Sequence, residues 1–530
     1  MKKEKFILLL ILIGFLVYFN SLFNGFVWDD EEQVINNVLV HSLSNFPLFF
    51  KGSTFNPGGG SALTGLYYKP LMTFFFSVVY SIFGSKPFFF HLFQLLLHVG
   101  NAVLVFVLLE HFFKKQKLSF FLSLIFLIHP MNAEAVVYVA ALQEILFFFF
   151  GMLALTFVIK EPVRLKDNGV IYLSTSFLLL LSLLSKETGI IFFALIFFYL
   201  LIYKRERLLN YFIFFLVSLA AYLILRFGLA GIYFQKHGLS PITRMDFWDR
   251  LISMPKIILF YLKTFFAPLD LAISQHWVVE KITWPDFSRP LIFDSLFFLA
   301  ILAIVIFLVI KQYSHVAIYF LFFFLWFIFA LGFHLHLFSL DLTVSDRWFY
   351  LPMVGMLGMF GAIAPKLKVK SEKLKVIITI IIIIILSWRT FIRTFDWRNG
   401  LTLYSHDIKI SKDAFDLENN LGVELFRVGR FDEAKIHFEN STKLAPYWWT
   451  NWNNLGVIYE RKGDFGKAAT YYKKAIDNGN YYLAYENYSG VLIKQNKKNE
   501  AKEFLEKEAL PKFPYNQKLR QLYLYLLQGK

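Results

Sequence analysis

The chain has 530 residues, of which 57% are hydrophobic and 20% aromatic, and it contains no cysteine. This composition excludes a soluble globular fold for most of the chain, and the lack of cysteine excludes disulfides and thiolate metal sites. Lys and Arg exceed Asp and Glu by 54 to 38, a net charge of +16. Because much of this surplus lies in short loops between apolar runs, it indicates membrane topology and not nucleic-acid binding.

Eleven apolar runs predict membrane-spanning helices. They are residues 6–23, 88–109, 118–129, 145–159, 170–185, 188–203, 208–226, 291–310, 316–334, 347–363 and 374–392. Several are shorter than the ~20 residues that cross a bilayer, so we expect their ends to extend into the flanks. The first run begins like a secretory signal, but no small-residue cleavage site follows its long apolar stretch, which favours a retained span.

Positive charges predict the orientation of these spans. Clusters of Lys and Arg lie at residues 2–5, 114–117, 160–166, 204–207 and 366–375, in alternate loops. Cytoplasmic loops carry such clusters, so the N-terminus is expected inside and everything after residue 393 outside. To keep this alternation, residues 251–269 are predicted to form an interfacial or re-entrant helix, and the short run 71–84 to lie along the outer surface.

The last quarter of the chain repeats with a period of 34 residues. Gly422, Gly456 and Gly490 stand in the similar phrases NNLGVELF, NNLGVIYE and NYSGVLIK. This spacing is typical of tetratricopeptide repeats, which stack helix pairs into a solenoid. We therefore predict an all-α protein with a membrane domain, residues 1–395, and a tetratricopeptide domain, residues 396–530. The three repeats are expected at about 415–448, 449–482 and 483–516.

Acidic side chains at the outer ends of apolar runs are candidates for catalysis. Asp29 and Asp30 follow the first span in NGFVWDDEE, and Glu134 follows the third in HPMNAEAV. At an interface, low polarity raises a carboxyl pKa towards the range of a general base. The structural alternatives are a solvated acidic loop for the aspartates and a helix-start acid for Glu134.

Cationic side chains at the same outer side are candidates for binding a phosphate. Arg347 in SDRWFYLP, Lys186 in LLSKETG, Lys69 in YYKP and His129 in LIHP form this set. An arginine binds an anionic headgroup through paired hydrogen bonds, although each of these residues also has a structural interpretation, such as snorkelling.

Carboxylates and cations on one face suit the transfer of a sugar from a lipid phosphate. A base removes the proton of an acceptor hydroxyl while fixed cations stabilise the departing phosphate, and direct displacement inverts the anomeric carbon. No glycine-rich strand-to-helix loop for a nucleotide is found in the sequence.

Together these segments resemble a known family. The run YFNSLFNGFVWDDEEQVINN, then YYKPL, FHLFQLLLHVGNAVLVFVLL, HPMNAEAV, SKETGI, DRWFYLP and the repeats are similar to the transmembrane-and-tetratricopeptide O-mannosyltransferases and their prokaryotic relatives. The resemblance implies a GT-C fold, a polyprenyl- or dolichyl-phosphate sugar donor (mannose for the animal members), and a catalytic site outside the cytoplasm. It also places the catalytic acid within Asp29–Asp30, and Glu134 and Arg347 near the donor phosphate.

The resemblance has limits that shape the expected function. Relatives usually carry a basic residue where this chain has Gln143 before Glu144, and the animal enzymes have many more repeats. The acceptor is therefore left open between protein and glycan, with the repeats binding it or a partner. The Phe-, Ile- and Lys-rich composition without cysteine is typical of a bacterium with AT-rich DNA, so a bacterial inner membrane is the expected location.

Two other classes of function are alternatives. An outer-face O-antigen ligase or polymerase would place its functional residues in a late loop, and residues 227–290 contain Arg244, Arg250, His276 and Glu280. A scaffold or transporter would not need acids and cations on one face, and a transporter should show an internal duplication. The acidic quartet 29–32 also suits magnesium, manganese or calcium, but no second acidic cluster matches it, so a metal-independent enzyme is expected.

Overall fold

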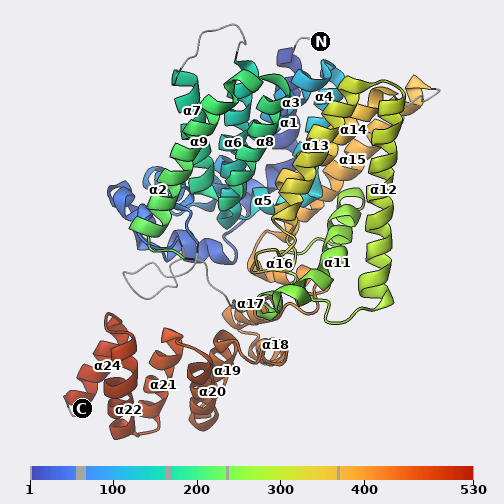
Figure 1. Ribbon diagram of the computed structural model, residues 1–530. Helices are drawn as coiled ribbons and strands as arrows, with labels where there is room; N and C mark the ends of the chain where they lie inside the picture. The colour runs from blue at the N-terminus through green and yellow to red at the C-terminus, as the bar shows by residue number, and fades with distance from the viewer. Residues whose placement is uncertain (1–2, 55–66, 162–168, 234–237, 367–370, 529–530) are drawn as a thin grey trace. The chain divides into compact units, whose positions relative to one another are not determined.

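The computed structural model describes residues 3–54, 67–161, 169–233, 238–366 and 371–528. Within these ranges the chain is helical and contains no β-strand (Figure 1). The prediction of an all-α membrane protein with a tetratricopeptide tail is therefore confirmed. The chain divides into two compact units: one comprises Met1–Phe55, Gly65–Ile273 and Val278–Asn399, and the other is built mainly from Gly400–Lys530.

The first unit contains eight helices that are long and apolar enough to cross a membrane, counted over the described residues. They are centred on α1 (Lys3–Tyr18), α3 (Pro87–Phe113), α6 (Leu142–Lys160), α9 (Leu208–Leu223), α12 (Arg289–Ile310), α13 (Ser314–Gly332), α14 (Tyr350–Ile363) and α15 (Glu372–Asp396). Each coincides with one of the eleven predicted runs.

The three remaining predicted runs form helices that are shorter. α4 (Gln116–Ile128) reaches spanning length only together with the segment Pro130–Val137, which includes α5 (Ala133–Val137) and is bent by 49° against it. α7 (Gly169–Ser185) and α8 (Ile191–Tyr203) are apolar but short. A total of about eleven crossings thus stays a prediction, since these three helices do not meet the length by themselves.

The two segments expected at the membrane surface are also helical. α2 (Pro70–Phe83) has only 14 residues. α11 (Phe247–Phe266) continues through Pro255 and carries Asp249, Arg250, Lys256 and Lys263. Its charges keep it out of the set of helices apolar enough to cross, which agrees with a place at the interface.

Small residues allow the membrane helices to approach closely. A Cβ atom added to Gly355 of α14 would lie 2.6 Å from the main-chain nitrogen of Phe327 in α13, and one added to Gly358 would lie 2.1 Å from the Phe323 ring. Inside a bilayer the hydrophobic effect does not drive helices together, so close packing of this kind supplies much of their attraction. These glycines therefore fix α14, which follows the short turn that contains Arg347 (Asp346–Phe349), against α13.

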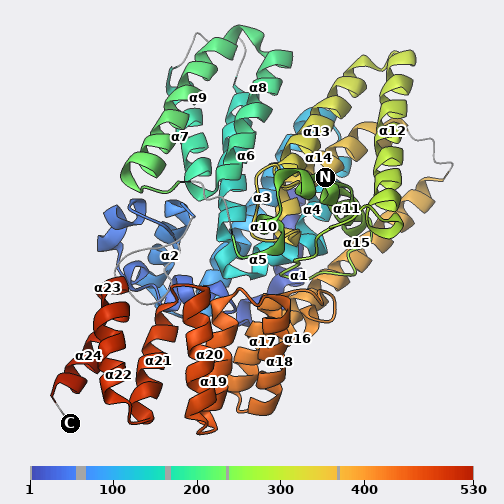
Figure 2. The same ribbon diagram turned by 60° about the horizontal axis from the view of Figure 1, so that its bottom comes forward.

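The second unit is a row of antiparallel helix pairs, best seen in Figure 2. The pairs are α17 (Phe415–Arg427) with α18 (Phe431–Leu444), α19 (Trp449–Arg461) with α20 (Phe465–Asn478), and α21 (Tyr482–Lys494) with α22 (Lys498–Phe504), followed by α24 (Gln517–Leu527). Each predicted repeat contains one pair. The boundary at residue 396 stays a prediction.

The repeated glycines differ in what surrounds them. A Cβ atom at Gly422 would lie 2.6 Å from the Phe438 ring, and one at Gly456 would lie 2.4 Å from the Tyr472 ring. At Gly490 nothing lies within 4 Å of the same position. In the first two repeats the missing side chain is therefore what lets the aromatic ring of the second helix rest on the first.

We predict that Gly456→Ala lowers the free energy of unfolding by about 1–3 kcal/mol, because the new methyl group overlaps the Tyr472 ring. The matched control Gly490→Ala is expected to be neutral or to stabilise by up to ~1 kcal/mol, since alanine is the better helix former. Thermal unfolding of the full-length protein, with limited proteolysis of the repeats, measures both. Equal stability of the two variants would contradict this account of the glycines.

Candidate active site

The first loop is fixed to the bundle by a buried carboxylate. Asp30 is fully buried, and its two oxygens accept hydrogen bonds from the main-chain N–H groups of Val27 at 3.1 Å and Ala140 at 2.7 Å. The preceding Trp28 has a positive φ of 54°, which turns the chain sharply. Asp30 thus ties the loop to the start of α6, and both its oxygens are engaged in doing so.

Asp29 lies beside this anchor but is only half-buried. Burial raises the pKa of its carboxyl to about 6, while a hydrogen bond from the Tyr138 hydroxyl and the positive charges of Arg347 and Lys69 keep the pKa from rising further. A group with this pKa is ionised at neutral pH yet remains basic enough to accept a proton. Of the two predicted aspartates, Asp29 is therefore the one placed to act as a base.

Glu134 is buried and makes an ion pair with the guanidinium of Arg347. Its oxygens also accept the Ser345 hydroxyl at 3.1 Å and the main-chain N–H of Arg347 at 3.0 Å. The Arg347 guanidinium in turn lies 5.9 Å from the centre of the Tyr138 ring. These bonds occupy the Glu134 carboxylate and hold Arg347, whose positive charge lowers the pKa of Asp29.

Two lysines complete the cluster. Lys186 donates to Glu144 at 2.5 Å, and Glu144 is only 3% exposed. Burial lowers the pKa of Lys69 to about 8, against the opposing effect of Glu187, and the charges of Lys186 and Arg347 contribute further lowering. The positive charges of Lys186 and Arg347 thus act on Lys69, and this repulsion favours the binding of an anion beside them.

His129 does not join the cluster. Its ring is 1% exposed and stacks on Phe265, with Nε2 donating to the Phe265 carbonyl at 2.9 Å and Nδ1 accepting the N–H of Met131 at 3.3 Å. Both ring nitrogens are thus occupied by the protein itself. The expected phosphate contact of His129 finds no support in this geometry, which is that of a buried helix-end residue.

Several residues of the cluster were not predicted from the sequence. Tyr138 joins Asp29 to Arg347, Ser345 holds Glu134, and Arg226 pairs with Glu187 beside Lys69. Ser345 and Glu187 stand next to predicted residues in SDRWFYLP and SKETGI, so those motifs contained a signal for them. Tyr138 and Arg226 lie in apolar surroundings in the sequence, where only the fold reveals their partners.

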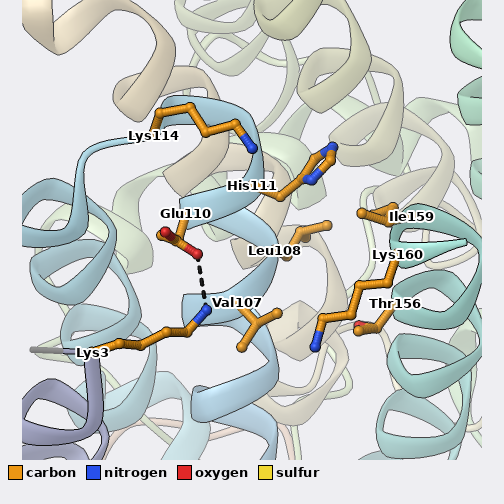
Figure 3. Close-up of a pocket in the computed structure, with 9 residues that line it drawn as sticks. All are labelled: Lys3, Val107, Leu108, Glu110, His111, Lys114, Thr156, Ile159 and Lys160. Atoms are coloured by element: carbon orange, nitrogen blue, oxygen red, sulfur yellow. Dashed lines mark hydrogen bonds and ion pairs between the residues drawn. The ribbon is translucent and has the colours of Figure 1, made fainter. Parts of the chain in front are cut away.

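A pocket of about 100 Å³ lies at the other end of α1 and contains none of the predicted site residues. It brings together Lys3, Lys114 and Lys160, and Lys3 forms an ion pair of 2.9 Å with Glu110 (Figure 3). These lysines come from three of the clusters predicted to be cytoplasmic. Because Lys3 begins α1 and Asp29 follows its end, the lysine pocket and the loop that carries Asp29 lie at opposite ends of this helix.

Two of the late-loop residues of the ligase alternative, His276 and Arg250, have structural partners. In the second unit, His276 Nε2 lies 2.8 Å from Asp416, which also accepts the Ser274 hydroxyl at 2.8 Å. Arg250 in α11 donates to the main-chain oxygens of Met245 at 2.8 Å and His336 at 3.3 Å. Both side chains hold segments of the protein together, so neither is placed like a reactive group.

In the described parts of the chain, no group of three or more His, Asp or Glu side chains is arranged to hold a metal ion. A reaction that needs no metal ion therefore stays a prediction.

The fold and this cluster define a polytopic membrane protein with a charged site and a tetratricopeptide tail, and comparisons with known proteins agree. Residues 449–478 match the tetratricopeptide repeat family. The chain is 24% identical to "Protein O-mannosyl-transferase F38B6.6" of Caenorhabditis elegans over 83% of its length and 63% of that relative. It is 25% identical to human "Protein O-mannosyl-transferase TMTC3" over 81% of its length and 50% of the relative.

A shorter match of 194 residues reaches 31% identity with human "Protein O-mannosyl-transferase TMTC1", over 34% of this chain and 21% of the relative. The homologues of this chain are therefore named protein O-mannosyl-transferases, as the resemblance in the sequence indicated. The chain spans between half and two thirds of the length of the first two relatives.

We predict that Glu134→Gln lowers the free energy of unfolding by about 3–5 kcal/mol, because it leaves the Arg347 guanidinium without its buried carboxylate. The control is Asp270→Asn, which breaks an ion pair with Lys263 whose side chains are 58% and 59% exposed. Exposed pairs contribute at most about 1 kcal/mol. Thermal unfolding in detergent compares the two, and similar midpoints would show that the buried pair is not structural.

Proposed function

We propose that the chain is an inverting membrane glycosyltransferase that moves mannose from a polyprenyl-phosphate carrier to a hydroxyl group of a protein. Its homologues carry the name protein O-mannosyl-transferase, which supports the sugar and the acceptor class. The observation that carries the proposal is the half-buried Asp29, with its pKa near 6, next to a group of cations that includes Arg347 and Lys69. A base beside an anion-binding group is what transfer from a sugar phosphate requires.

In the proposed reaction Asp29 accepts the proton of the acceptor hydroxyl. The hydroxyl oxygen attacks the anomeric carbon from the side opposite the phosphate, so a new carbon–oxygen bond forms as the sugar–phosphate bond breaks. The phosphate leaves with the bonding electrons and remains attached to its lipid. A single displacement of this kind inverts the configuration at the anomeric carbon.

Arg347, Lys69 and Lys186 are proposed to bind the donor phosphate. Charge grows on the phosphate as the bond breaks, and cations already fixed in place stabilise it without reorganisation. Glu134 and Ser345 act on Arg347, and Glu144 acts on Lys186, so these residues position the cations and do not touch the sugar. Asp30 is assigned the same supporting role for the loop that carries Asp29.

The site is proposed to face the non-cytoplasmic side, in a bacterial inner membrane. The lysine pocket of Lys3, Lys114 and Lys160 at the other end of α1 supports this orientation, because positive charge collects on the cytoplasmic side. The tetratricopeptide unit, which follows α15, is proposed to bind the acceptor or a partner on the side of the site. The donor is already activated, so the proposal requires no nucleotide and no metal.

The central experiment compares the wild type with Asp29→Asn and Asp30→Asn in reconstituted membranes. Labelled polyprenyl-phosphate mannose and a peptide rich in Ser and Thr serve as substrates. Because the Asp29→Asn variant lacks the base, it is expected to transfer the sugar about 10²–10⁴-fold more slowly than the wild type, with little change in thermal stability. Asp30→Asn is expected to lower the unfolding temperature, because the anchor of the loop weakens.

Asp270→Asn provides a charge-matched control at an exposed ion pair, and addition of EDTA tests the metal-independent reaction. Transfer at the wild-type rate by Asp29→Asn would end the assignment of the base. If the wild type transfers glucose and not mannose from the polyprenyl phosphate, the proposed sugar is wrong and the proposed mechanism stands.

We predict a bell-shaped dependence of kcat/KM on pH. The rate rises through about pH 6 as Asp29 becomes ionised and falls above about pH 8 as Lys69 loses its proton. The Tyr138 hydroxyl stabilises the ionised Asp29, so Tyr138→Phe is expected to raise the pKa of Asp29 and move the acidic limb up by about 1 pH unit. An acidic limb that stays in place, or moves down, would argue against Asp29 as the titrating base.

A further inference from the structure

The lysine pocket brings together charged side chains from the ends of three membrane helices (Figure 3). Lys3 begins α1, and Lys160 is the last residue of α6. Glu110 lies in the last turn of α3, and Lys114 follows the end of that helix. Apolar side chains also line the pocket, namely Val107, Leu108 and Ile159. The proposed base and the proposed donor-binding cations are absent from the lining, so this pocket is a separate site.

The lining carries more positive than negative charge. Three ammonium groups stand against the single carboxylate of Glu110, a surplus of two positive charges when His111 is counted as neutral. The dipoles of one helix start and two helix ends at the pocket add about −0.5 of a charge, so a positive charge remains. The pocket therefore attracts an anion.

Two of the three lysines have no partner for their ammonium groups within the described residues. Lys3 donates to Glu110 at 2.9 Å, whereas Lys114 and Lys160 form no hydrogen bond or ion pair there and are exposed. Lys114 also has a φ of 52°, in the left-handed region that glycine usually supplies after a helix. A lysine at this position costs conformational free energy that a glycine would avoid, and its charge beside the pocket gives a reason for it.

The size of the pocket points to a ligand. A lysine at a helix end also stabilises the helix dipole, but that effect acts on each helix by itself. It gives no reason for lysines from three helices to share one cavity. The volume of about 100 Å³ is several times the roughly 10–15 Å³ that one water molecule needs. A group of several heavy atoms, such as a phosphate, therefore fits.

The pocket lies at the level of the lipid headgroups. α3 has 27 residues and is therefore about 40 Å long, which exceeds the ~30 Å hydrocarbon core of a bilayer. Its end thus reaches the headgroup region, where basic pockets between membrane helices bind acidic lipids. The apolar side chains of Val107, Leu108 and Ile159 give the glycerol and acyl groups of a lipid a surface that a free phosphate ion does not use.

We propose that the lysine pocket binds the phosphate group of an anionic phospholipid. Lys114 and Lys160 donate hydrogen bonds to the phosphate oxygens, and Lys3 adds its charge while it remains bonded to Glu110. A zwitterionic lipid carries an ammonium group of its own, which these lysines repel. Inorganic phosphate offers the same group without the lipid and is therefore the competing ligand in the test.

The experiment measures binding to the purified full-length protein in a neutral detergent. Native mass spectrometry counts the bound molecules when phosphatidylglycerol or phosphatidylcholine with the same acyl chains is added, and thermal unfolding follows the same titrations. The wild type is expected to bind phosphatidylglycerol about 10-fold more tightly or better. Inorganic phosphate at matched ionic strength is expected to give no comparable rise in the unfolding temperature.

Three variants locate the binding. Lys114→Gln and Lys160→Gln each remove one charge and preserve most of the side-chain length, so each is expected to weaken the binding of phosphatidylglycerol by about 3–10-fold. Lys115→Gln is the matched control, because it removes the same charge from the neighbouring exposed residue, which does not line the pocket. Circular dichroism checks the helical content of each variant, and the comparison of lipids on the wild type requires no variant.

Equal affinity of the wild type for the two lipids would overturn the inference. Equal loss of binding in Lys115→Gln and Lys114→Gln would do the same, because it indicates a general attraction of the basic surface. Protection by inorganic phosphate equal to that by phosphatidylglycerol would assign the pocket to a soluble anion and remove the lipid. Asp29→Asn is expected to bind phosphatidylglycerol like the wild type, so the outcome for this pocket is independent of the outcome for sugar transfer.

Discussion

The buried ion pair between Glu134 and Arg347 is the constraint on which the candidate site depends. A guanidinium at the end of an apolar bundle is costly unless its charge is compensated, and Glu134 compensates it with both oxygens engaged. The pair joins the segment after α4 to the start of α14, more than two hundred residues later in the chain. Arg347 consequently has a fixed position, and the pKa of Asp29 is set partly by that position.

The two adjacent aspartates have different environments because one is fully buried and the other is not. Asp30 is fully buried and accepts main-chain N–H groups from Val27 of its own loop and from Ala140 just before α6. Asp29 instead meets the Tyr138 hydroxyl and the positive charges of Arg347 and Lys69, and it is only half-buried. Asp30 holds the loop, and the carboxylate of Asp29, the residue before it, is left partly accessible.

Much of this architecture could be predicted from the sequence. The eleven apolar runs all coincide with helices, and the 34-residue period located each helix pair of the second unit. Hydropathy could not reveal the bend of 49° after α4, because bending depends on neighbours and not on composition. The site was only partly predictable: motifs gave the charged residues, whereas the engagement of His129 with Phe265 and the place of Tyr138 depend on contacts distant in sequence.

Asparagine side chains join the neighbouring repeats, since Asn454 donates to Asn419 at 2.8 Å and Asn487 donates to Asn453 at 3.0 Å. A solenoid grows by adding copies of the same unit, and each copy contacts only its neighbours. Duplication of a repeat that carries both asparagines would thus add a unit that already has its hydrogen bonds to the neighbouring units. The tail can lengthen by gene duplication in this way without any change in the packing of the membrane helices.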